Sequence, residues 1–124
     1  MIGENEALAH YLVRQVPGFA ESPELEAVPA SDRDRSDTVA GALGRYLLRL
    51  EKRAVRREGE AADSLSLDRA FDVLEELAAS DDPAIREALV VAVFGPLHAD
   101  DVVVAVVETR LGPLAGALFR RWAV

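Results

Sequence analysis

The segment from residue 67 to residue 78 constrains the fold more than any other part of the chain. Its apolar residues recur at intervals of three and four without a gap: Leu67, Ala70, Phe71, Leu74, Leu77 and Ala78. That spacing is typical of one face of an α-helix, which turns once in about 3.6 residues. Ser64 or Ser66 can cap this helix, so we expect the preceding GEAAD stretch, residues 59–63, to be a linker.

The same periodicity predicts further helices on both sides of this segment. One covers residues 6–16 and ends at Pro17-Gly18, and another begins at Asp37 or Thr38 and ends near Gly59. The apolar stripe predicted for the second of these is Val39, Leu43, Tyr46, Leu47, Leu50 and Ala54. Gly41 and Gly44 fall inside this helix, where they permit close helix packing.

Residues 19–37 are predicted to form a loop with one short helical turn. Ser22 can cap that turn, and Pro23 suits its first helical position. At the other end of the chain, residues 113–122 are expected to form the last helix. Its predicted buried residues are Leu114, Leu118 and Trp122.

Two β-branched runs, residues 88–94 and 102–107, can be interpreted as helices or as buried strands. Helices are favoured because each run follows an acidic residue that can cap a helix, Asp82 for the first and Asp100 or Asp101 for the second. Neither run alternates apolar with polar residues, but strands stay open as the alternative. Gly95-Pro96 and Gly112-Pro113 are each predicted to end one helix and start the next. The expectation is a single all-α domain over residues 1–124, with five to six antiparallel helices.

Composition limits what kind of protein this is. The 124 residues match one domain, and the absence of cysteine excludes disulfides, thiolate metal sites and a cysteine nucleophile. Glu4 and Glu6 occupy the place of a basic signal-peptide region, and the longest apolar run, residues 88–97, is far below the roughly 18 residues of a membrane span. We therefore expect a cytoplasmic protein with no membrane contact. Thirteen of its fourteen cations are arginine, and with the many alanines this suggests a bacterial genome.

The sequence shows no catalytic or metal-binding motif. His98 precedes Asp100 and Asp101, but no second histidine stands nearby, so a solvent-facing turn with one aspartate as a helix cap is the favoured interpretation. His10 is predicted on a helix flank. Zinc-protease, serine-hydrolase and phosphate-loop patterns are all absent. We expect no enzyme activity, no metal and no cofactor.

Charge is distributed unevenly in this acidic chain, whose net charge is −8. Six of its fourteen cations form a basic ridge on one predicted helix: Arg45, Arg49, Lys52, Arg53, Arg56 and Arg57. Residues 58–108 hold thirteen acidic residues and two arginines, a net charge of −11. Such a field repels nucleic acid, so we expect no nucleic-acid partner.

Two other interpretations of this charge layout remain open. The default is that the ridge pairs with the protein's own carboxylates. The other is that the acidic half receives a basic protein, because a carboxylate-rich face speeds the capture of a cationic partner. The candidate binding residues are Asp68, Asp72, Glu75, Glu76, Asp81 and Asp82.

Residues 71–97, FDVLEELAASDDPAIREALVVAVFGPL, resemble a HEAT-type helical pair. In such repeats an amphipathic helix ends in an acidic turn, and the next helix begins with an aliphatic residue and an arginine, here Ile85 and Arg86 after Asp82-Pro83. The resemblance implies a HEAT-like helical bundle or short solenoid.

A second resemblance rests on the order of three short motifs. GRYLLRL, then LEELAASDDPAI, then LGPL with a terminal Trp122 is similar to small all-α bacterial proteins of unknown function. Some of their relatives are thought to be immunity partners of polymorphic toxins. This resemblance implies an immunity or inhibitor protein that binds a basic toxin domain, and the alternative is a helical scaffold or adaptor.

Overall fold

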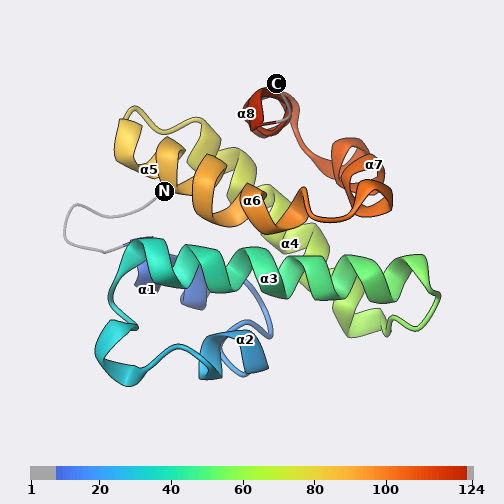
Figure 1. Ribbon diagram of the computed structural model, residues 1–124, viewed down its shortest axis with the longest axis horizontal. Coiled ribbons are helices and arrows are strands. Elements are labelled where there is room, and N and C mark those ends of the chain that lie inside the picture. The colour runs from blue at the N-terminus through green and yellow to red at the C-terminus, as the bar shows by residue number, and fades with distance from the viewer. Residues whose placement is uncertain (1–7, 123–124) are drawn as a thin grey trace.

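The computed structural model describes residues 8–122, and within them every regular element is a helix (Figure 1). The α-helices are α1 (Leu8–Gln15), α2 (Pro23–Glu26), α3 (Ser36–Val55), α4 (Ala61–Ala78), α5 (Pro83–Ala88), α6 (Phe94–Leu97), α7 (Asp101–Arg110) and α8 (Pro113–Trp122). A 3₁₀ turn, η1 (Ala30–Asp32), precedes α3, and a π-helical segment, η2 (Leu89–Val93), joins α5 to α6. The side chain of Trp122, which was predicted to be buried, lies outside the described residues, as do residues 1–7.

The all-helical prediction is confirmed, including the helical interpretation of residues 88–94 and 102–107. The predicted number of helices was too low. The segments α5, η2 and α6 run without a break and count as one helix. On that count, residues 8–122 form seven helices rather than five to six. The short helix α2 accounts for the difference. It begins as predicted, with Pro23 in the first turn and the Ser22 hydroxyl accepting from the amide of Leu25 at 3.2 Å.

Helix α3 crosses the middle of the molecule, with α1 and α2 on one side and the α5–η2–α6 helix on the other (Figure 1). Its predicted stripe supplies much of the hydrophobic core, and Val39, Leu43, Leu47 and Leu50 are all buried. Ala54 is exposed, contrary to the prediction. It lies in the last turn of α3, which ends at Val55 rather than near Gly59.

Two helices approach closely where Gly44 of α3 meets η2. A Cβ atom at Gly44 would lie 2.5 Å from the carbonyl oxygen of Val93 and 2.9 Å from that of Ala92. The predicted role of this glycine in close packing is confirmed, and a helix carrying any side chain here could not come as near.

The predicted helix break at Gly95-Pro96 was wrong, and the π-helical segment η2 explains why. A proline in an α-helix removes one hydrogen bond and its ring clashes with the carbonyl four residues earlier, here that of Ala92. In η2 the ladder shifts to five residues, with the Phe94 amide donating to the carbonyl of Leu89. The helix therefore continues through Pro96 to Leu97. The second break is as predicted, because α7 ends before Gly112 and Pro113 opens α8.

Helix α4 buries every residue of its predicted apolar face. Its start was misplaced, because it begins at Ala61 inside the predicted linker rather than after a serine. The cap is acidic: the amide of Glu60 donates to Asp63 Oδ2 at 3.2 Å. Asp63 is fixed in turn by Arg53 of α3, whose Nε lies 3.1 Å from Asp63 Oδ2.

Helix α8 packs in a different register from the predicted one. Ala115 and Phe119 are buried, whereas Leu114 is 50% exposed and Leu118 is only half-buried. The ring of Phe119 meets Phe94 edge to face at 5.1 Å and stacks on His98 at 4.0 Å between centroids. His98 is therefore half-buried, not solvent-facing as expected.

Candidate interaction surface

The six predicted binding carboxylates lie on α4 and in the turn after it. Five of them are exposed, and Glu75 is half-buried. Asp68 and Asp72 stand one helical turn apart on the solvent side of α4, where residues four apart are neighbours. Asp81 and Asp82 belong to the turn between α4 and α5. The structure thus places all six near the protein surface, but it gives them different roles.

Glu75 is a helix cap for a distant part of the chain. Its Oε1 accepts from the amide of Ala115 at 2.7 Å, and its Oε2 accepts from the amide of Leu114 at 3.1 Å. These amides are among the unpaired donors of the first turn of α8. Gly112 permits the approach, since a Cβ there would lie 2.5 Å from Glu75 Cδ. Glu75 therefore fastens α8 to α4.

Glu76 and Asp82 also serve the fold. The hydroxyl of Tyr11 in α1 donates to Glu76 Oε2 at 2.6 Å, and Arg69 Nη1 lies 3.9 Å from Glu76 Oε1. Burial, reinforced by the hydrogen bond to Glu76, raises the pKa of Tyr11 to about 12. Asp82 Oδ1 accepts from the amide of Ala84 at 2.9 Å and so caps α5.

The other three predicted carboxylates make no hydrogen bond or ion pair with residues 8–122. Asp68, Asp72 and Asp81 are exposed, and we call these three residues the acidic surface. Their charges are available to a partner without any cost to an internal contact. Exposed carboxylates of this kind can attract a cationic protein over distances of about 10 Å at moderate salt.

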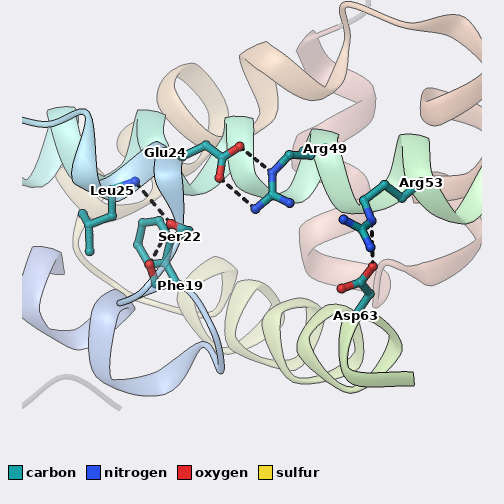
Figure 2. A network of polar contacts seen from close by, with 7 residues as sticks. All are labelled: Phe19, Ser22, Glu24, Leu25, Arg49, Arg53 and Asp63. Carbon is teal, nitrogen blue, oxygen red and sulfur yellow. Dashed lines mark hydrogen bonds and ion pairs between the residues drawn. The ribbon is translucent and has the colours of Figure 1, made fainter. Parts of the chain in front are cut away.

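The basic ridge is partly neutralised by the protein itself (Figure 2). Arg49 forms a two-pronged pair with Glu24 of α2, with Nε 2.8 Å from Oε2 and Nη2 3.1 Å from Oε1. The hydrogen bonds to Glu24 are the main cause that raises the pKa of Arg49. Arg53 pairs with Asp63 at 3.1 Å and lies 3.9 Å from Glu60. Arg45, Lys52, Arg56 and Arg57 have no such partner among the described residues.

Glu51 of α3 is a charged side chain buried in the core, and it was not predicted from the sequence. Its side chain is 0% exposed and lies beside Arg110 at the end of α7, whose Nε is 2.9 Å from Oε2 and 3.2 Å from Oε1. Burial raises the pKa of Glu51, and the charge of Arg110 opposes that rise. One signal was present: Glu51 stands four residues after Leu47, inside the apolar stripe.

The described residues contain no cluster suited to a metal ion. Within residues 8–122 no group of three or more histidine, cysteine or acidic side chains is arranged to hold a metal ion. His10 is exposed on α1. Burial lowers the pKa of His98, although its Nε2 lies 3.2 Å from the carbonyl oxygen of Phe119. Asp100 caps α7, as expected for one of the two aspartates, by accepting from the amides of Val102 and Val103 at 2.9 and 3.1 Å.

Among the helices of residues 8–122, none has the length and apolar character needed to cross a membrane. Comparison of the sequence with protein-family models, curated proteins and solved structures finds no match.

Proposed function

We propose that this chain is a non-enzymatic protein-binding module that captures a basic partner protein through the acidic surface. The resemblance of the sequence to small all-α bacterial proteins suggests that the module is an immunity or inhibitor protein, which neutralises a basic toxin domain. The observation that carries the proposal is the availability of Asp68, Asp72 and Asp81, which are exposed and engaged in no internal contact. They lie within the segment 58–108, whose net charge is −11.

The physical basis of the proposal is electrostatic steering. Charges of one sign on a rigid surface raise the rate at which an oppositely charged protein finds it, and this gain falls as salt screens the field. The outer face of α4 is rigid because its opposite face is buried in the core. Glu75 and Glu76 lie on the same helix as Asp68 and Asp72 and belong to the same acidic segment.

The same geometry determines how the proposal is tested. Glu75, Glu76 and Asp82 should be left intact, because their replacement would damage a cap or a buried contact. The informative variant is Asp68→Lys with Asp72→Lys and Asp81→Lys. A matched control with the same change in net charge is Glu21→Lys with Glu26→Lys and Glu58→Lys, three exposed positions outside α4.

The assay measures association and dissociation rates with a basic toxin domain as the partner, by surface plasmon resonance at several salt concentrations. We expect the acidic-surface variant to associate about tenfold or more slowly and to show a flatter salt dependence, with a smaller change in dissociation. Circular dichroism checks that each variant is folded. If the control slows association equally, net charge alone is responsible and the acidic surface is not the site. Absence of binding by the unaltered protein leaves a scaffold or adaptor role in its place.

A further inference from the structure

The solvent side of α3 carries a shallow hollow of about 290 Å³. Its lining comes from one helix and comprises Arg45, Leu48, Arg49, Lys52, Arg53 and Arg56. Five of these six side chains are cationic and none is acidic, in a protein whose net charge is −8. The hollow is therefore a local reversal of the protein's overall charge.

Two of the lining arginines are held by the fold itself. Arg49 is drawn to Glu24 of α2, and Arg53 to Asp63 of α4, on elements that flank α3 (Figure 2). Arg45, Lys52 and Arg56 make no hydrogen bond or ion pair with the described residues. They stand seven and four residues apart, so a helix that turns about 100° per residue places them in one row. This row of three available cations runs along the hollow.

We propose that this hollow binds an acidic, extended segment of a partner protein. Its carboxylates pair with Arg45, Lys52 and Arg56, and an apolar side chain between them contacts the half-buried Leu48. The row runs from Arg45 of α3 to its C-cap Arg56, a rise of about 16 Å at 1.5 Å per residue. An extended peptide of about five residues has the same length. The occupant has the opposite charge to the one bound by the acidic surface, so this inference stands apart from the proposed function.

The hollow suits a peptide better than a nucleic acid. Proteins that bind single strands stack bases on exposed aromatic rings, and the aromatic residue nearest to the row, Tyr46, is buried under the guanidinium of Arg49 at 5.5 Å. A long polyanion would also meet the negative field of the rest of the chain. A short acidic segment extends less far into that field, and it offers Leu48 an apolar contact.

The test uses fluorescence anisotropy with a labelled peptide of sequence Glu-Glu-Leu-Glu-Glu. It is run at roughly 50 mM salt, where charge interactions still reach beyond ~10 Å. The variant combines Arg45→Gln, Lys52→Gln and Arg56→Gln. Its matched control combines Arg35→Gln, Arg120→Gln and Arg121→Gln, three exposed arginines that lose the same charge outside the hollow. Circular dichroism verifies that both are folded.

We expect the hollow variant to weaken peptide binding about tenfold, because each of three ion pairs at the surface contributes modestly. The control should bind as the unaltered protein does, and the neutral peptide Gln-Gln-Leu-Gln-Gln should not bind. Three results would overturn the proposal: no binding of the acidic peptide, an equal loss in both variants, or tighter binding of an oligothymidylate that the hollow variant abolishes. The last result would make the hollow a nucleic-acid site.

Discussion

Replacing Arg110 with glutamine would leave the carboxylate of Glu51 without its counter-charge in the core. Glu51 is 0% exposed, while Arg110 is 31% exposed at the end of α7. The two partners are therefore unequal: the arginine can reach water when its partner is lost, but the glutamate cannot. We expect Arg110→Gln to destabilise the protein more than Glu51→Gln does.

The size of the effect follows from the proton that Glu51 can bind. A buried carboxyl without a partner becomes neutral rather than staying charged, so protonation sets an upper limit on its cost. Holding a proton above the ordinary pKa of 4.5 costs about 1.4 kcal/mol per pH unit. The electrostatic penalty of Arg110→Gln is then at most about 3 kcal/mol near pH 7 and about 1 kcal/mol near pH 5.

The sign of the pH dependence can also be derived. Burial raises the pKa of Glu51 in the folded state, so protonated Glu51 favours folding. This stabilisation is fully present below pH 4.5, and it is lost as the pH rises through the raised pKa. Loss of Arg110 removes the charge that opposes the rise, which extends the loss to higher pH. In Glu51→Gln the titrating group is gone, and this pH dependence should disappear.

The measurement is urea denaturation followed by circular dichroism at both pH values, for the unaltered protein and the two variants. Arg110→Gln should lose markedly more unfolding free energy near pH 7 than near pH 5, relative to the unaltered protein. If its loss is the same at both pH values, Glu51 is not a buried titrating group and the reasoning fails.

Two further predictions concern packing. Gly44→Ala should destabilise the protein by about 1–3 kcal/mol, because the new Cβ would clash with the backbone carbonyl of Val93 at 2.5 Å. Gly41→Ala on the same helix should instead stabilise the protein by up to about 1 kcal/mol, because its Cβ would meet only the end of the Arg45 side chain at 3.4 Å. Thermal denaturation of the pair checks both signs, and equal behaviour would contradict the close approach to η2. Leu74→Ala should cost about 2–5 kcal/mol in denaturant titration, while Leu65→Ala, at a 69% exposed position of the same helix, should change stability by less than about 0.5 kcal/mol. A small loss at Leu74 would be inconsistent with the core described for α4.

Sequence patterns correctly predicted the features that depend on contacts within a few residues. The apolar face of α4 and the cap at Ser22 follow from spacing and from hydrogen bonds within a few residues, and both are confirmed. The predicted start of α4 was wrong because serine is the commoner cap, whereas here Glu60 is the N-cap and its amide donates to Asp63, which Arg53 holds in place. That support comes from another helix, which no local pattern reveals.

The errors elsewhere have the same origin in tertiary contacts. The register of α8 depends on Glu75, which caps the helix, and on His98, which stacks on Phe119. Both Glu75 and His98 are distant in sequence from their contacts in α8. The burial of Glu51 depends on Arg110, fifty-nine residues later. For the predicted carboxylates, composition indicated an acidic segment, but only the contacts separate the three that serve the fold from Asp68, Asp72 and Asp81.

The cap that Glu75 provides for α8 affects the order in which the protein folds. The two amides it accepts from lie 39 and 40 residues later in the chain, so the first turn of α8 gains this cap only when α4 is already in place. Short helices are marginal in water on their own, because nucleation of the first turn is costly. Since α4 is also synthesised before α8, the carboxylate of Glu75 is already present when the first turn of α8 emerges. We therefore expect α8 to join the structure as a late, non-local step, because contacts of long sequence separation slow folding.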